Sequence, residues 1–163
     1  MEIVVRKMVA TDIEQVQHIA TTSWHNTYKH SIPIDIQTNF LQRTYSDEAL
    51  LERLENSHFF VTQIANQLVG FANFSLLDVN QQVELGALYL LPSAKRKGIG
   101  SKLLKIGIER IGNVKQVLVH VEKHNQAALQ FYKQKGFVVI KEFDELFYNH
   151  PLQTIQLMLY VSE

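Results

Sequence analysis

The chain has 163 residues, of which 46% are hydrophobic and 20% are charged, and it contains seven Gly, three Pro and no Cys. This size and composition are typical of one globular domain that folds by packing alone, without disulfides or thiolate metal sites. Sixteen Lys and Arg balance sixteen Asp and Glu. The protein as a whole therefore has no electrostatic field that would attract nucleic acid or a membrane surface, and we expect neither partner.

The first residues of the chain mix apolar and charged side chains, and no apolar stretch approaches the length of a signal sequence or a membrane span. We therefore expect a soluble, cytoplasmic protein. The lack of Cys also excludes a covalent mechanism through an enzyme thiol.

The N-terminal part predicts one strand followed by helices. Ile3–Val5 is β-branched and predicts a short strand. Thr11 with Glu14 three residues later predicts a capping box at the start of a first helix. Further helices are expected over residues 34–41 and after Ser46, which is a good N-cap residue.

From residue 59 the pattern becomes one of strands and helices. A β-hairpin is expected over residues 59–76, and the apolar run over 83–91 predicts a buried strand that Pro92 ends. The later expected elements are a helix over residues 99–111, a strand over 117–121, a helix over 126–135 and strands over 137–140 and 154–161. This order contains a parallel βαβ unit and predicts one α/β domain of mixed α+β character.

A basic, glycine-containing turn lies between the strand that ends at Leu91 and the next helix. Its sequence is Lys95-Arg96-Lys97-Gly98-Ile99-Gly100-Ser101. Glycine lets successive backbone N–H groups converge on an anion at the positive end of a helix, so this turn is a candidate phosphate site. The alternative is a solvated basic loop with a glycine turn.

Two common phosphate motifs do not fit this turn. The chain has no GxxxxGK[ST] sequence, and after Gly98 and Gly100 the third position of the dinucleotide fingerprint is Leu103 rather than Gly or Ala. Nucleotide triphosphate and dinucleotide sites are therefore disfavoured.

The turn, preceded by Tyr89–Pro92, resembles the acyl-CoA motif of the GNAT family of N-acetyltransferases, which reads Gln or Arg, two residues, Gly, one residue, Gly or Ala. Lys95 departs from this pattern, with Arg96 beside it. The family's second signature, Asn-x-x-Ala-x-x-Phe-Tyr-x-x-x-Gly-Phe, is matched by Asn125, Ala128, Phe131, Tyr132, Gly136 and Phe137. The stretch from Trp24 to Tyr28 is similar to polyamine-acetylating and other small-amine members.

This resemblance implies a single N-acetyltransferase domain over residues 1–163, with a central, mostly antiparallel sheet, a parallel splayed strand pair and flanking helices. It implies direct transfer of an acetyl group from acetyl-CoA to a primary amine, with a small amine or polyamine favoured over a protein amine. The alternative is a non-catalytic CoA-binding regulatory module. Release of free CoA thiol that depends on an amine distinguishes the two.

The resemblance also implies where acetyl-CoA binds. The pantetheine arm resembles an extra β-strand and should pair with backbone groups of the central strand, while the turn holds the diphosphate. Asn125 can be the N-cap of its helix, a contact to the cofactor, or both. The residues expected at this site are Leu88, Tyr89, Leu90, Lys95, Arg96, Lys97, Gly98, Ile99, Gly100, Ser101 and Asn125.

Two side chains are candidates for the proton transfers. Tyr132 stands at the position of the family's usual general acid, where its hydroxyl can donate to the departing thiolate. Glu84 is the candidate general base, near the place where family members often carry a carboxylate. Some family members carry a second carboxylate where this chain has Gly86, so waters or backbone carbonyls are alternatives for the general base. Glu84 can also be an ordinary exposed strand residue without a catalytic role.

The amine should approach from the side opposite the CoA, between residues 24–36 and a loop joining the last two strands. Aromatic residues gather in both segments, so Trp24, Tyr28 and Tyr148 are candidate substrate contacts, as is Phe147, with Asp144 and Glu145 attracting a cation. The alternative for each is ordinary surface packing.

The seven histidines do not predict a metal site. His120 and His124 are four residues apart but span a strand end and lack the HExxH arrangement. His25, His30 and His150 are expected as polar loop residues that line the amine pocket. The two C-terminal strands offer an edge that many members use for dimers, so a homodimer is also expected.

Overall fold

The computed structural model describes residues 2–162 and shows five helices, two short 3-10 turns and seven strands in this part of the chain. In chain order they are β1 Ile3–Lys7, η1 Ala10–Asp12, α1 Ile13–Tyr28, α2 Ile34–Thr44, α3 Asp47–Asn56, β2 His58–Ile64, β3 Gln67–Phe74, β4 Gln82–Leu90, η2 Pro92–Ala94, α4 Ile99–Ile111, β5 Gln116–Glu122, α5 Gln126–Gln134, β6 Val138–Phe147 and β7 His150–Tyr160. Within residues 2–162, none of the helices combines the length and apolar content needed to cross a membrane.

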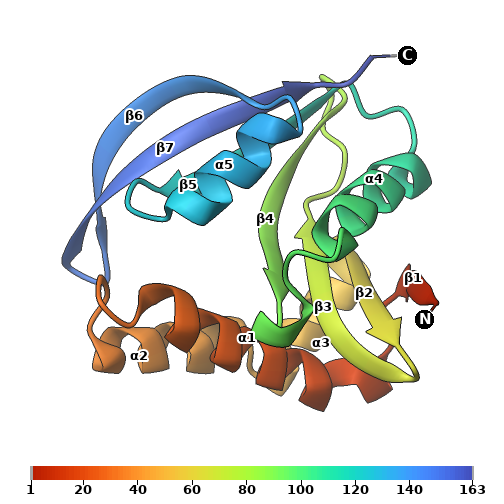
Figure 1. Ribbon diagram of the computed structural model, residues 1–163, viewed down its shortest axis with the longest axis horizontal. Helices are drawn as coiled ribbons and strands as arrows, with labels where there is room; N and C mark the ends of the chain where they lie inside the picture. Colours follow the sequence, from red (N-terminus) through yellow and green to blue (C-terminus); the bar gives the residue numbers. More distant parts are fainter. Residues whose placement is uncertain (1, 163) are drawn as a thin grey trace.

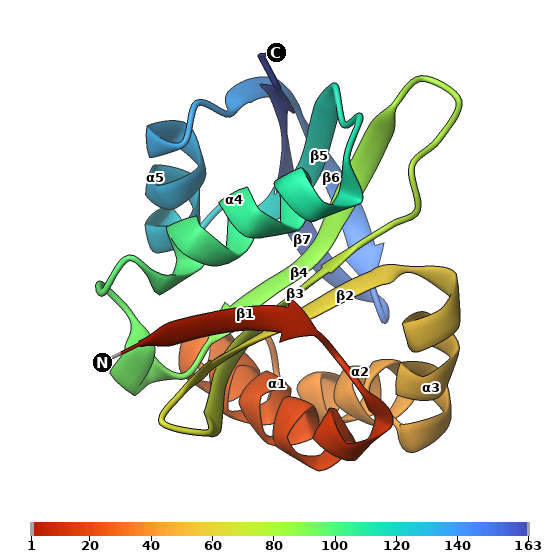
Figure 2. The ribbon, with the colours of Figure 1, turned by 90° about the vertical axis from the view of Figure 1, so that its right-hand side faces the viewer.

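The seven strands form one sheet in the order β1-β2-β3-β4-β5-β7-β6. All neighbours are antiparallel except β4 and β5, which are parallel. Figures 1 and 2 show α1, α2 and α3 on one side of the β1–β4 half and α4 on the other. The expected mostly antiparallel sheet with one parallel pair is confirmed.

Two hydrophobic cores hold these layers together. One core lies between the sheet and the helices α4 and α5, and the other lies between the sheet and α1–α3. Helix α4 sits so close to the sheet that a Cβ added at Gly107 would lie 2.7 Å from a ring carbon of Phe74. The small residue therefore sets the depth to which α4 packs.

A β-bulge in β4 changes which of the two cores the side chains of this strand face. Leu85 pairs with Phe74 and Ala87 pairs with Asn73, so Gly86 is an extra residue without a partner on β3. Before the bulge, Leu85 faces the α4–α5 core, and after it Ala87 faces the α1–α3 core. One strand therefore serves both layers.

The C-terminal hairpin differs from its prediction. The strands expected over 137–140 and 154–161 extend to residues 138–147 and 150–160, joined by a tight turn in which Tyr148 and Asn149 have φ of 51° and 63°. Asp144 and Glu145 consequently lie within β6 rather than in a loop. Eight of the ten β6 residues are exposed, so backbone pairing with β7, not an apolar pattern, maintains this strand.

Strand β6 forms an outer edge of the sheet. It begins with three exposed apolar residues, Val138, Val139 and Ile140. A homodimer through this edge stays a prediction.

The start of α1 is stabilised by Asp12 rather than by the capping box expected at Thr11 and Glu14. Asp12 is only 4% exposed. It accepts hydrogen bonds from Arg6 Nη1 at 2.8 Å, from Arg6 Nη2 at 2.9 Å and from the Val9 N–H at 2.9 Å. Burial raises the pKa of this carboxyl, but the hydrogen bonds and the Arg6 charge outweigh burial and leave the pKa below its ordinary value.

Replacing Asp12 with Ala should lower the free energy of unfolding by about 2 kcal/mol at pH 7, measured by urea denaturation, because Arg6 and the Val9 N–H lose their partner. The folded-state pKa lies below the ordinary 3.8, so this stabilisation is present above about pH 4 and is lost as the pH falls through the folded-state value. The difference from wild type should therefore shrink in acid. The exposed Asp35→Ala change is the control, and a difference that stays constant from neutral to acid pH contradicts the assignment.

Candidate active site

A gap opens at the centre of the sheet because β4 and β5 separate. Their pairing covers four residue pairs and ends at Leu85 and Val119. Beyond that point β4 stays paired with β3 as far as Leu90, and no strand within residues 2–162 pairs with its other edge. The Ser23 hydroxyl of α1 donates to the Leu90 carbonyl at 2.9 Å. The residues Leu88–Leu90 therefore present a largely unpaired strand edge to the gap.

The basic turn lies at one end of this gap. Gly98 has φ of 75° and is the N-cap of α4, and Arg96 also has a positive φ of 64°. The first backbone bond of α4 runs from the Lys102 N–H to the Gly98 carbonyl at 3.1 Å, which leaves the N–H groups of residues 99–101 available at the positive end of the helix. A Cβ at Gly100 would lie 3.4 Å from the Phe131 ring, so the turn sits against α5.

The basic side chains of this region divide into two groups. Lys95, Arg96 and Lys97 are exposed on the turn. Lys102 instead donates to the Ile3 carbonyl at 2.9 Å and so points toward β1. The cationic end of the gap is therefore made by three consecutive residues and the helix terminus.

Helix α5 brings the second signature to the other wall of the gap. Asn125 is its N-cap, with Oδ1 accepting from the Ala128 N–H at 3.2 Å, which confirms the capping role. Tyr132 is 6% exposed and packs between Phe131 and Phe137. Burial, together with nearby Tyr89, raises the pKa of Tyr132. The phenol is therefore protonated at neutral pH and can act as a donor.

Three tyrosines from different elements converge here. Tyr89 of β4 accepts a hydrogen bond from Trp24 Nε1 at 3.1 Å. Tyr28, the last residue of α1, faces the side chain of Asn125, and burial raises the pKa of Tyr28 as it does that of Tyr89. Helix α1 is thereby fastened to β4, one wall of the gap.

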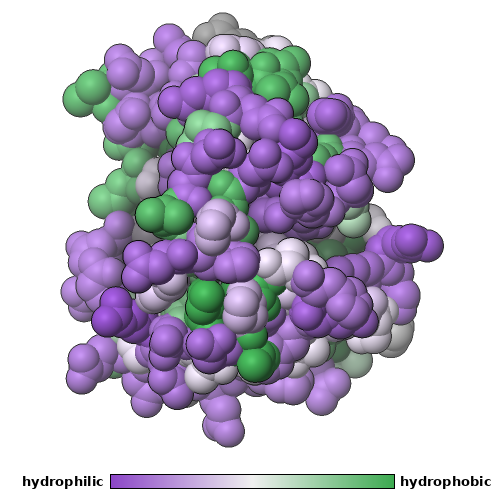
Figure 3. All heavy atoms as spheres, turned by 90° about the vertical axis from the view of Figure 1, so that its left-hand side faces the viewer, coloured by the Kyte–Doolittle hydropathy of each residue, from purple (hydrophilic) through white to green (hydrophobic). Residues whose placement is uncertain are grey.

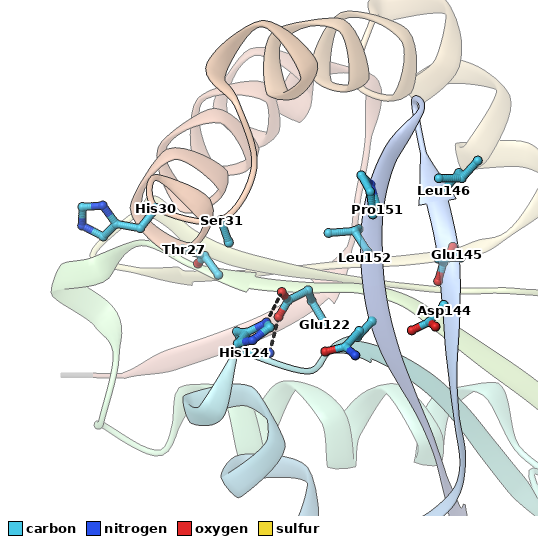
Figure 4. A pocket seen from close by; sticks show the side chains of 11 residues that line it. Thr27, His30, Ser31, Glu122, His124, Asp144, Glu145, Leu146, Pro151 and Leu152 are labelled. Atoms are coloured by element: carbon cyan, nitrogen blue, oxygen red, sulfur yellow. Dashed lines mark hydrogen bonds and ion pairs between the residues drawn. The ribbon is translucent and has the colours of Figure 1, made fainter.

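A cavity of about 1040 Å³ lies between the end of α1, the end of β5 and the β6–β7 hairpin (Figure 4). Its lining consists of Thr27, His30, Ser31, Glu122, His124, Asp144, Glu145, Leu146, Pro151, Leu152 and Gln153. Three of these residues are acids, and none of the Lys and Arg of residues 2–162 is among the lining residues. The cavity therefore suits a cationic group.

Glu122 is the most enclosed of the three acids, with a side chain only 8% exposed. Its carboxylate accepts from the backbone N–H groups of His124 and Asn125, and its Oε1 lies 3.0 Å from His124 Nδ1. Glu145 accepts from the Thr154 hydroxyl. Glu122 was not predicted as a site residue, because its contacts come from the turn into α5 and leave no spacing signal in the sequence.

A second cavity of about 630 Å³ adjoins the first and shares His30 and Ser31 with it. His25 and His150 line this second cavity. The three histidines expected at the amine pocket thus lie on the walls of these two adjacent cavities.

The structure places the predicted aromatic contacts away from the cavity walls. Trp24 is 5% exposed, and its ring stacks on Phe40 at 4.3 Å and on Phe147 at 5.8 Å. Tyr148 lies at the tip of the hairpin against Phe147. Trp24, Tyr28 and Tyr148 are not among the residues that line either cavity. Packing among the aromatic residues accounts for the position of Trp24.

Glu84 lies at the closed end of the gap, one residue before the last β4–β5 pair. Its side chain is 49% exposed, and its Oε1 lies 3.6 Å from Nδ1 of His120. Gly86, the bulge residue, contributes no carboxylate. The two candidates for proton transfer, Glu84 and Tyr132, therefore both flank the gap.

The chain is similar to known acetyltransferases. Residues 13–137 match the model of the Acetyltransferase (GNAT) family. A spermidine N(1)-acetyltransferase from Thermoplasma acidophilum is 30% identical over 148 residues, which cover 85% of this chain and 90% of that protein.

Solved structures of such proteins share the fold. PaiA N-acetyltransferase from Thermoplasma acidophilum, in complex with coenzyme A, has a TM-score of 0.84 at 23% identity and covers 99% of this chain and 100% of its own. The ribosomal-protein-S18-alanine N-acetyltransferase from Escherichia coli has a TM-score of 0.75 at 18% identity, over 99% of this chain and 96% of its own. The family match spans most of the chain, including the gap, the basic turn and α5. The chain is therefore an N-acetyltransferase of the GNAT family.

Proposed function

We propose that this protein transfers the acetyl group of acetyl-CoA directly to a primary amine, with a small amine or polyamine as the favoured acceptor and a protein amine as the other candidate. The observation that carries the proposal is the opposite charge on the two sides of one gap. The basic turn at α4 suits the phosphates of CoA, and the carboxylate-lined cavity suits an ammonium group.

Acetyl-CoA is proposed to enter through the gap beside α4. The N–H groups of residues 99–101, with Lys95–Lys97, bind the diphosphate, and the edge of Leu88–Leu90 pairs with the pantetheine arm as another strand would. Asn125 borders the same gap and can contact the arm while it caps α5. The PaiA structure with bound coenzyme A, which has this fold, supports acetyl-CoA as the co-substrate.

Tyr132 is proposed as the general acid. When the bond between the acyl carbon and sulfur breaks, the electron pair stays on sulfur, and a nearby hydroxyl stabilises the thiolate by donating its proton. Burial keeps Tyr132 protonated until that moment. Its position on α5, in the core that α5 shares with α4 and the sheet, supports this role, because the basic turn proposed to bind CoA begins α4.

The acceptor is proposed to bind in the larger cavity. Glu122, Asp144 and Glu145 attract a cationic amine, and the wall contributed by α1 limits its size. The face that carries the β6–β7 hairpin is mostly hydrophilic, with hydrophobic atoms in separate small patches (Figure 3), which fits a small polar acceptor. The similarity to a spermidine N(1)-acetyltransferase supports a polyamine.

A proton must leave the acceptor before it can react. An alkylamine has a pKa of about 10.4 and is almost fully protonated at pH 7, so it has no free electron pair for attack. Glu84, at the closed end of the gap, is the carboxylate proposed to assist the removal of this proton.

The function is tested by measuring release of CoA thiol from acetyl-CoA in the presence of polyamines, amino acids, aminoglycosides and peptide N-termini. We expect thiol release that depends on the amine and is fastest with polyamines, with the acetylated amine identified by mass spectrometry. A protein that binds CoA but acetylates none of these amines is instead a CoA-binding regulatory module, and the proposal then fails.

Replacing Tyr132 with Phe should lower kcat by roughly 10²-fold to 10⁴-fold, because the thiolate loses its proton donor while the ring packing is kept. The affinity for CoA, measured by calorimetry, should stay within about twofold, since the hydroxyl acts only when sulfur becomes charged. Phe131→Tyr, one residue away, is the matched control that adds a hydroxyl. A Tyr132→Phe variant as fast as wild type removes Tyr132 from the role of acid.

Replacing Lys95, Arg96 and Lys97 together with Ala should raise KM for acetyl-CoA roughly tenfold and leave kcat nearly unchanged. Exposed charges contribute about 0.5 kcal/mol each, and they bind the ground state and the transition state equally. The control is a triple Ala variant at the exposed Lys7, Arg110 and Lys115, which changes the net charge equally. An equal rise of KM in both variants would show that only net charge matters.

A further inference from the structure

A carboxylate and an imidazole face each other across the closed end of the gap. Glu84 Oε1 and His120 Nδ1 are 3.6 Å apart, and their side chains are 49% and 37% exposed. This separation is an ion-pair distance rather than a formed hydrogen bond, and such contacts tighten when a substrate binds. With Nδ1 turned toward the carboxylate, Nε2 is the nitrogen that can accept a proton.

His120 points toward the acceptor side of the sheet. Side chains alternate between the two faces of a strand, and its neighbours Val119 and Val121 belong to the core under α4 and α5, as does Tyr132. Glu122, which lines the acceptor cavity, is two residues further along β5 and therefore lies on the same face as His120, about 7 Å away. The imidazole and the Tyr132 phenol thus lie on opposite faces of the gap.

Residues on β6 and β7 surround the ring of His120. Phe143 stands edge-on to the ring with centroids 5.9 Å apart. Gln156 is directly opposite on β7, and its buried Oε1 has no hydrogen-bond partner among the described residues. The charged groups that face His120 are Glu84 on β4, Glu122 on β5 and Lys141 on β6.

We propose that His120 is the catalytic base that takes the first proton from the acceptor amine, and that Glu84 is a positioning residue for its ring. This proposal rests on the proposed acetyl transfer to an amine. It refines the sequence-based assignment of Glu84 as the base, because the Glu84 carboxylate lies 3.6 Å from an imidazole nitrogen.

The proton balance is complete with these groups. One N–H bond of the ammonium breaks, its proton goes to Nε2 of His120, and the freed electron pair attacks the acyl carbon. The bond between carbon and sulfur then breaks with its electrons on sulfur, and the thiolate takes the proton of Tyr132. A second proton leaves the nitrogen as the amide forms and restores the phenol, the third stays on the amide, and His120 returns its proton to water.

The test compares His120→Gln and Glu84→Gln with wild type, using 1,4-diaminobutane and spermidine as acceptors. At pH 7 we expect kcat/KM for the amine to fall by roughly 10²-fold to 10⁴-fold in His120→Gln, and by less in Glu84→Gln, where the imidazole remains. Without a base, the variant uses only amine that is already neutral in solution. Its defect should therefore shrink by about tenfold for each pH unit between pH 7 and pH 9. A merely structural role would not produce this recovery.

The exposed His18→Gln on α1 is the matched control and should keep wild-type rates. CoA affinity and thermal unfolding show that each variant folds, and His120→Asn provides a second variant should His120→Gln be unstable. A wild-type rate in both His120 variants, a defect that does not change with pH, or a larger loss in Glu84→Gln than in His120→Gln overturns the proposal. If wild type binds CoA but acetylates no amine, the proposed function has failed, and the role of His120 fails with it.

Discussion

The site depends on one constraint, which is that β4 and β5 can pair over only four residues. Strand β5 is paired with β7 along its whole length, and β4 is paired with β3 from Leu85 to Leu90. Because each of the two strands is held by a different neighbour and the sheet twists, β4 and β5 separate after four pairs. The backbone groups left at the β4 edge must find partners other than a strand. A ligand with alternating donors and acceptors, such as a pantetheine arm, satisfies this need without any special side chain. The bulge at Gly86 strengthens the effect, because it turns the following residues to the opposite core just where β5 departs.

Helix α1 connects the two substrate regions through that gap. Ser23 binds the Leu90 carbonyl, Trp24 binds the Tyr89 hydroxyl, and Tyr28 faces Asn125. These contacts come from residues on consecutive turns of the helix and reach β4, where the pantetheine arm is expected, as well as the start of α5. Thr27, near the end of α1, and His30 and Ser31, just after it, line the larger cavity. Any shift of α1 therefore changes both the width of the gap and the shape of the amine pocket.

The sequence predicts most of the fold because its signals are local. The strand run that ends at Pro92, the glycine at the start of α4 and the Asn125 cap each act through their own neighbours, and these features appear as predicted. The β6–β7 hairpin was underestimated because β6 is exposed and is held by pairing rather than by apolar alternation. The start of α1 differs for a similar reason. Asp12 is held there by hydrogen bonds from Arg6 on β1, and the sequence around Thr11 does not reveal this contact. Trp24 is predicted at the amine site from the aromatic residues near it in the sequence. The sequence alone does not show which residues pack on its ring, and in the structure these are Phe40 and Phe147.

A chain with no net charge can still bind two charged substrates, because folding separates its charges across one gap. Lys95–Lys97 and the α4 terminus collect positive charge on one side, while Glu122, Asp144 and Glu145 collect negative charge on the other. In the proposed reaction the anionic carrier and the cationic acceptor are thereby attracted to opposite sides of the gap, and each is repelled from the side proposed for the other. The separation also affects chemistry. An ammonium held among carboxylates keeps its proton more firmly, so the groups that attract the acceptor work against its reaction. In the proposed mechanism the imidazole of His120, beside the carboxylate of Glu84 at the closed end of the gap, resolves this conflict, because an imidazole receives the proton without adding another negative charge around the amine.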